Sequence, residues 1–87
     1  MTTEEAAMFI KDIEAVYPNY FRSADLTLVV KHWGAIFNGI EYEFAIKGLY
    51  EVVRETSNAY PSANELYQKA KEVKRYEYLI NGGIIGG

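Results

Sequence analysis

Apolar side chains recur every three or four residues along most of this chain, which is the spacing that gathers them on one face of a helix. Short breaks interrupt the pattern after Tyr17, at Asn38-Gly39 and around Pro61. The pattern therefore predicts four helices, over residues 2–17, 24–37, 41–56 and 62 to about 79. Helices of these lengths joined by short loops indicate an all-α fold, a small bundle of about four helices.

The sequence also marks where these helices begin. Thr2 and Glu5 have the spacing of a capping box, in which the hydroxyl and the carboxylate each accept a backbone N–H at the helix start. Ser62 and Glu65 repeat this spacing before the fourth stretch. Ser23 is the expected N-cap of the second helix, because a serine hydroxyl accepts the free N–H groups of a first turn.

The second stretch contains Leu28-Val29-Val30, which is β-branched enough to resemble a strand. We predict a helix, because the helical spacing continues and no second strand is available to pair with it. Asn38-Gly39 then favours a helix C-cap over a hairpin turn. The side chains expected to face inward are Leu26, Val29, Val30, Trp33, Ile36 and Phe37.

The third stretch carries a buried stripe with a glycine, Gly48, in its middle. Glycine within a helix costs about 1 kcal/mol relative to alanine, so its presence needs a packing reason. We expect a large side chain to lie close to it, and Trp33, the only tryptophan, is the candidate. The stripe consists of Phe44, Ala45, Gly48, Leu49, Val52 and Val53.

Composition and charge narrow the class of protein. The chain has 87 residues, of which 49% are hydrophobic, so it forms one folded domain with a small core. It has no cysteine, which excludes disulfides and thiolate metal sites and fits a reducing cytoplasm. No apolar run approaches the roughly 20 residues of a membrane-crossing helix, and the acidic start is unlike a signal peptide. The net charge of −3 argues against general affinity for nucleic acid.

The residue types of a catalytic or metal centre do not occur in a credible pattern. His32 is the only histidine and no cysteine accompanies it, so a nucleophilic dyad lacks its usual members. Asp25 and His32 would supply two metal ligands without a third. Phosphate-binding loops and dinucleotide fingerprints are also missing from the sequence. We therefore expect no enzyme activity and no cofactor.

Tyrosine is the one residue type in clear excess, with eight among 87 residues. Two interpretations remain open. Half-buried tyrosines can seal a small core, and exposed tyrosines can form a protein-binding face because they combine apolar area with a polar group. Tyr20 and Phe21, which follow Pro18, are expected to fold back over the core rather than to dock a partner.

The last seven residues, 81–87, are rich in glycine and are expected to form a flexible tail behind a helical domain of residues 1–80. Ile84 and Ile85 are apolar residues on this tether, suited to docking in a groove of a partner, although they equally fit the edge of a longer chain. The predicted partner-binding set combines them with the end of the fourth stretch: Lys71, Lys74, Arg75, Tyr76, Tyr78, Leu79, Ile80, Ile84 and Ile85.

The order of these elements resembles the N-terminal helical domain of phage replicative-helicase loader/inhibitor proteins. In that family an early helix ends in a Tyr-Pro pair, a tryptophan-bearing helix follows, and a further helix leads to an aromatic-Pro-Ser segment with a glutamate shortly after it. Here these positions are Tyr17-Pro18, Trp33 and Tyr60-Pro61-Ser62 with Glu65. The resemblance spans roughly residues 5–70.

The resemblance implies a non-enzymatic, cytoplasmic adaptor of phage DNA replication. Such proteins bind a hexameric replicative helicase, hold back its ATPase activity and contact the origin-binding initiator, so no direct contact with nucleic acid is expected. The family's helicase contact is attributed largely to a flexible segment after the helical domain. This chain has only the short glycine-rich tail at that place.

Two other functions remain open. Lys69, Lys71, Lys74 and Arg75 on the fourth helix would give a small DNA-binding or regulatory module its phosphate contacts. A tyrosine-rich surface would equally suit a phage protein that binds a host protein. Salt separates these classes, because DNA binding weakens steeply as the salt concentration rises, whereas an apolar docking surface changes little.

Overall fold

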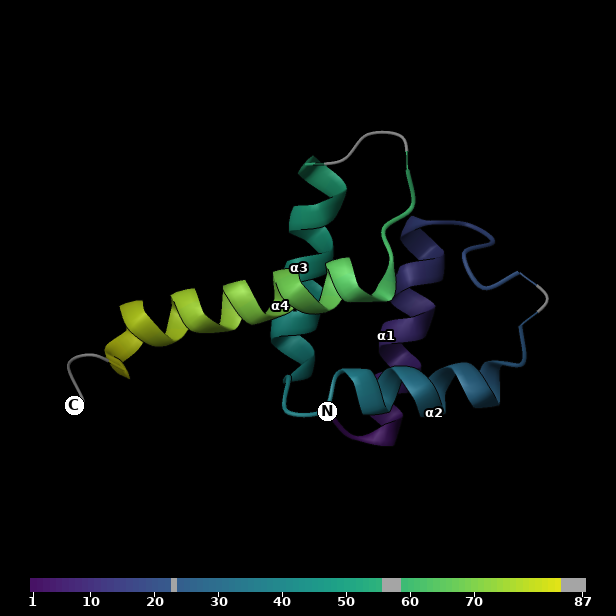
Figure 1. Cartoon of the computed structure of the whole chain (residues 1–87), viewed down its shortest axis with the longest axis horizontal. Coiled ribbons are helices and arrows are strands. Elements are labelled where there is room, and N and C mark those ends of the chain that lie inside the picture. Colours follow the sequence, from purple (N-terminus) through teal and green to yellow (C-terminus); the bar gives the residue numbers. More distant parts are fainter. Residues whose placement is uncertain (23, 56–58, 84–87) are drawn as a thin grey trace.

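Helices account for nearly all the regular structure in the computed structural model, which describes residues 1–22, 24–55 and 59–83 (Figure 1). Within these ranges the chain forms no strand, so the all-α prediction is confirmed. The helices are α1 (Thr3–Val16), α2 (Leu26–Ile36), α3 (Tyr42–Glu55) and α4 (Ala63–Tyr78), and a wider π-helical turn, η1, follows over Leu79–Gly83.

Both predicted capping boxes form. The Thr2 hydroxyl accepts the N–H of Glu5 at 3.1 Å, and the Glu5 carboxylate accepts the N–H of Thr2 at 2.8 Å. Ser62 and Glu65 make the same reciprocal pair at the start of α4. These side chains satisfy N–H groups that have no partner inside the helix, and they fix where α1 and α4 begin.

The predicted start of α2 is wrong by two residues. Asp25 is the N-cap, because its carboxylate accepts the N–H of Thr27 at 2.9 Å, and the helix begins at Leu26. Ser23, the predicted cap, lies outside the described residues. At the other end of α2 the C-cap is Phe37, and Gly39 lies two residues further on in the turn with φ of +87°, a left-handed conformation that glycine adopts without strain.

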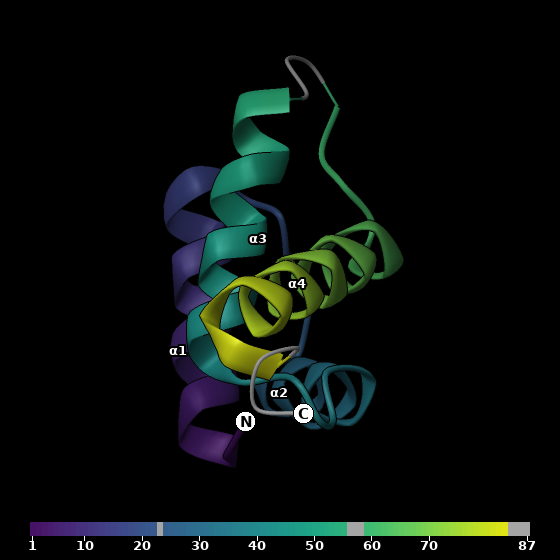
Figure 2. The same ribbon diagram turned by 90° about the vertical axis from the view of Figure 1, so that its left-hand side faces the viewer.

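The helices form two crossed pairs. α1 and α3 stand side by side, and α2 and α4 run across them, so that both crossing helices are seen nearly end-on in Figure 2. The most extensive packing joins α3 to α4. The chain is therefore not a simple up-and-down bundle, because neighbouring elements along the sequence cross rather than align.

Gly48 allows this crossing. A Cβ at Gly48 would lie 2.9 Å from the backbone nitrogen and 3.0 Å from the Cα of Ala70, so only glycine lets the α4 backbone come this close to α3. The expectation that Trp33 packs there is wrong. The Trp33 ring instead stacks on Phe37, with ring centroids 5.8 Å apart, and meets Phe9 edge to face.

The core draws on all four helices and their connections. Its largest fully buried side chains are Phe9, Ile13, Phe37, Leu49 and Leu66. Buried or half-buried apolar side chains surround them and exclude water from the crossing point of the helices, which is the main favourable contribution to folding.

Tyr20 and Phe21 cover one side of this core, as predicted. The Phe21 ring packs edge-on against Trp33 at 5.3 Å between centroids, and the Tyr20 ring stacks with Tyr60 at 5.8 Å. The Tyr20 hydroxyl also donates to the carbonyl of Pro61. The α1–α2 connection is thereby fastened to the segment that leads into α4.

The helical conformation continues further than the sequence suggests. We predicted that the glycine-rich end leaves the helix at Asn81, but η1 carries the helical path to Gly83. Residues 84–87, with Ile84 and Ile85, lie outside the described part of the chain. The division into a helical domain of residues 1–80 and a flexible tail of residues 81–87 stays a prediction.

Candidate protein-docking surface

The C-terminal half of α4 extends beyond the other helices, as the yellow end of the ribbon in Figure 1 shows. Four large apolar or aromatic side chains at this end are exposed to solvent: Tyr76 by 65% and Tyr78 by 65% on α4, and Leu79 by 44% and Ile80 by 56% on η1. We call these four residues the α4 tip. Large apolar side chains grouped at an exposed end are typical of a surface that contacts another molecule.

The predicted partner-binding residues divide between two sides of α4. Lys71, Lys74, Arg75 and Tyr78 border a shallow hollow of about 560 Å³, whose other wall is the α2–α3 turn at Gly39. Tyr76 instead borders a separate hollow of about 460 Å³. The structure therefore brings one tyrosine together with the basic residues and directs the other away from them.

Ion pairs tie this basic side to the rest of the domain. The Lys74 ammonium lies 2.9 Å from the Glu41 carboxylate and donates to the carbonyl of Gly39 at 2.7 Å. The hydrogen bond from Lys74 lowers the pKa of the Glu41 carboxyl from its ordinary value. Lys69 is held in the same way by Glu55 of α3, at 3.0 Å. Both lysines are thus occupied within the fold.

The remaining two cations are less engaged. Lys71 lies over the ring of Tyr67, with its nitrogen 5.4 Å from the centroid, in a cation–π contact. Arg75 forms no ion pair within the described residues. A DNA-binding role for this face is therefore weakly supported, because two of the four proposed phosphate contacts already neutralise carboxylates.

Two tyrosines outside the tip, Tyr42 and Tyr60, take structural positions. The Tyr42 hydroxyl donates to the Asp12 carboxylate, which links α3 to α1, and this hydrogen bond together with burial raises the pKa of Tyr42 to about 12. Tyr60 donates to the carbonyl of Pro18 at 2.9 Å. Tyrosine thus both seals the core and contributes the exposed tip, so the two interpretations of its excess apply to different residues.

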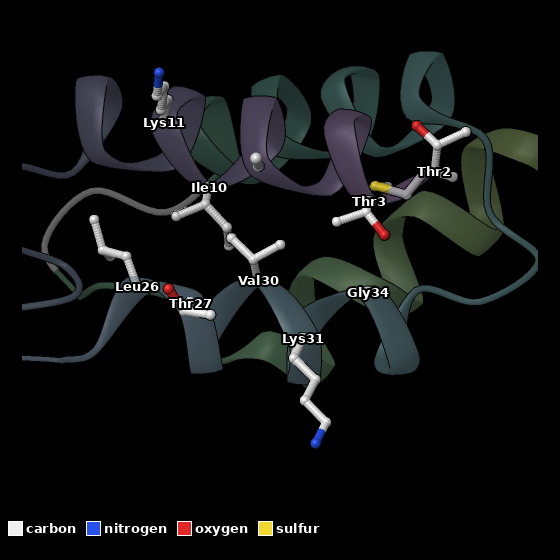
Figure 3. A pocket seen from close by; sticks show the side chains of 11 residues that line it. Thr2, Thr3, Ile10, Lys11, Leu26, Thr27, Val30, Lys31 and Gly34 are labelled. Atoms are coloured by element: carbon white, nitrogen blue, oxygen red, sulfur yellow. The ribbon is translucent and has the colours of Figure 1, made fainter.

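The sequence did not predict a second apolar surface, which lies between two helices. A groove of about 690 Å³ runs between α1 and α2 (Figure 3), and its lining includes Ile10, Leu26, Val30 and Gly34. Leu26 and Ile36 were expected to face inward, but they are 49% and 42% exposed, and that prediction is wrong. α2 is apolar on several sides, so the spacing of its residues did not identify the face that packs inward.

Metal ligands do not gather in the described ranges. Within them, no group of three histidine, aspartate or glutamate side chains converges as metal ligands would. None of the helices there is long and apolar enough to cross a membrane. On the described surface, exposed apolar side chains lie beside charged side chains.

The described residues thus form a small all-α domain with exposed apolar surfaces. A family model describes the chain more closely: the G39P N-terminal domain matches residues 1–67. The chain belongs to this family, the N-terminal domain of the phage helicase loader G39P. Neither the curated proteins nor the solved structures gave a match to the chain.

Proposed function

We propose that this chain is a non-enzymatic adaptor of phage DNA replication that binds a hexameric replicative helicase, with the origin-binding initiator as a further partner. The observation that carries the proposal is membership of the helicase-loader family over residues 1–67. The all-α fold and the exposed apolar side chains are consistent with an adaptor.

The α4 tip is the surface that we assign to the helicase. It follows residue 67, so it lies beyond the part of the chain that the family model matches. Its tyrosines resemble the aromatic side chains that supply most of the binding energy in protein interfaces. Lys71 and Arg75 lie beside Tyr78 and would give the contact a polar, positively charged rim.

Alanine substitutions test this assignment. A Tyr78→Ala, Leu79→Ala double variant removes two exposed side chains of the tip, and the matched control is Tyr50→Ala on α3, where the tyrosine is 52% exposed. We expect the double variant to bind the purified helicase at least about tenfold more weakly, as for side chains at the centre of an interface. The control should bind as the unaltered chain does.

Binding is measured by immobilising the helicase and titrating each variant at two salt concentrations, with thermal unfolding recorded for every variant. Equal affinity of the double variant and the control would remove the tip from the helicase contact. A steep loss of affinity with salt, together with binding to DNA alone, would favour the DNA-binding alternative.

A further inference from the structure

The most apolar helix of the domain is also the least buried. α2 reads LTLVVKHWGAI and contains one formally charged residue, Lys31, yet none of its side chains is fully buried. Leu26 and Leu28 are each about half exposed, at 49% and 50%. A helix that is apolar on several sides is normally covered by other elements, so α2 carries apolar surface beyond what its own domain uses.

Part of this surface forms the groove between α1 and α2. Figure 3 shows Ile10 of α1 and Leu26 and Val30 of α2 pointing toward one another across it. Its lining also includes two small residues, Gly34 and Ala7. The volume of about 690 Å³ suits one row of apolar side chains from another helix.

The charges around the groove have one sign. Lys11 on α1 and Lys31 on α2 are the only charged side chains in the lining, and no carboxylate occurs there. Figure 3 places the two lysines on opposite walls with their ammonium groups directed outward. Neither forms an ion pair with another residue in the described part of the chain, although the protein as a whole carries a net charge of −3.

We propose that this groove binds an acidic amphipathic helix of a protein partner. Apolar side chains three and four residues apart would enter the groove, and glutamates or aspartates on the flanks would pair with Lys11 and Lys31. A second copy is a poorer occupant, since its own exposed apolar tip carries Lys71 and Arg75 beside Tyr78. The groove shares no residue with the α4 tip, so this site goes beyond the helicase contact proposed above.

Two designed peptides test the proposal. Each is an amphipathic helix of about 15 residues with leucines at spacings of three and four; one carries glutamates on its flanks and the other carries lysines at the same positions. Each is titrated into the full isotopically labelled chain, and amide shifts are followed by NMR. We expect the acidic peptide to shift amides along α1 and α2 and to bind at least about tenfold more tightly than the basic one.

Charge reversal supplies the matched variants. Lys11→Glu, Lys31→Glu should weaken binding of the acidic peptide at least about tenfold. Lys71→Glu, Arg75→Glu makes the same change in net charge on α4 and should alter its affinity less than about twofold, because those residues lie outside the groove. A third variant, Thr27→Trp, fills the groove without changing its charge and should also reduce binding.

Three results would overturn the proposal. The first is that the peptide shifts amides of α4 instead of α1 and α2, and the second is equal affinity for the acidic and basic peptides. The third is self-association of the chain that Thr27→Trp abolishes, which would make a second copy the occupant. Failure of these tests leaves the helicase assay at the α4 tip unaffected, because the two sites are altered by different variants.

Discussion

Two helical glycines in this domain lie in different packing environments. Gly48 lies where the α4 backbone approaches α3, and a Cβ there would come within 3.0 Å of backbone atoms of Ala70. Gly34 lies where α2 passes α1, and its nearest neighbour to an added Cβ is the Ala6 side chain at 3.8 Å, an ordinary contact. One glycine is required by packing, and the other only weakens its helix.

Alanine at each position should therefore change the free energy of unfolding in opposite directions. We expect Gly48→Ala to destabilise the domain by about 1–3 kcal/mol, because α4 must move away from α3. Gly34→Ala should stabilise it by up to about 1 kcal/mol through better helix propensity. Urea unfolding followed by circular dichroism measures both. A Gly48→Ala variant as stable as the unaltered chain would mean that the helices do not cross as closely as described.

The hydrogen bond between Tyr42 and Asp12 makes stability depend on pH. It keeps the Tyr42 hydroxyl protonated and, with burial, raises its pKa from 10.0 to about 12. A group with a raised pKa contributes its stability fully below its unfolded pKa, here about 10, and loses it as the pH rises through the folded pKa.

The comparison is between the unaltered chain and Tyr42→Phe. Their difference in free energy of unfolding should be constant below about pH 10 and should shrink between about pH 10 and 12. Denaturant titrations at several pH values measure it, and taking the difference cancels the ionisation of the other tyrosines and the lysines. A difference that is independent of pH up to 12 would show that Asp12 does not hold the Tyr42 proton.

At the scale of the helices, the start of α4 matters most because α4 carries both its packing on α3 and the exposed tip. Ser62→Ala removes the N-cap hydroxyl that accepts the N–H of Glu65 at 3.1 Å. We expect a loss of about 1 kcal/mol, and Ser62→Asp, which keeps an acceptor, should lose much less. Hydrogen exchange in the first turn of α4 reports the effect directly. Equal exchange in all three proteins would mean that the cap contributes nothing.

The sequence predicted α1 and α4 well because their ends carry strong local signals, and it predicted α3 from the regular spacing of its apolar stripe. Capping boxes at Thr2 and Ser62 and the proline after Tyr17 act over a few residues, so they can be read without knowing the fold. α2 lacks such a clear pattern. Its true cap is Asp25, and because its apolar residues surround the helix, their spacing did not reveal which face meets α1.

The two surfaces also differ in how far the sequence could predict them, because one is local in sequence and the other depends on how the helices pack. The α4 tip lies along one continuous stretch of the chain, so its residues could be proposed from the sequence, and their role in binding stays a prediction. The α1–α2 groove arises from how two helices cross, and residues such as Ile10 and Val30 are distant in sequence. The partner of Gly48 was equally hidden, because a glycine shows that something approaches closely but not what approaches.

Over the whole molecule, the two apolar surfaces lie on different pairs of elements. The α4 tip extends the domain along its longest dimension of 47 Å, and the groove lies between α1 and α2 (Figures 1 and 3). An adaptor that brings two proteins together needs surfaces that can be occupied at the same time. We expect the two sites to bind independently, since no residue borders both.

Removing residues 81–87 should affect stability and helicase binding differently. We expect the truncated chain to keep its thermal unfolding temperature, because the buried core ends at Val73, and to bind the helicase more weakly. The two measurements are thermal unfolding by circular dichroism and a helicase titration. Unchanged affinity would place the contact entirely on the helices, at the α4 tip or elsewhere.

We propose that this chain acts on a replicative helicase without being an enzyme itself. A purified hexameric replicative helicase is passed over the immobilised chain, with and without ATP, and both its retention and its ATPase rate are recorded. We expect specific retention of the helicase and a reduced ATPase rate. A well-folded chain that neither retains the helicase nor changes its ATPase rate would contradict this proposal.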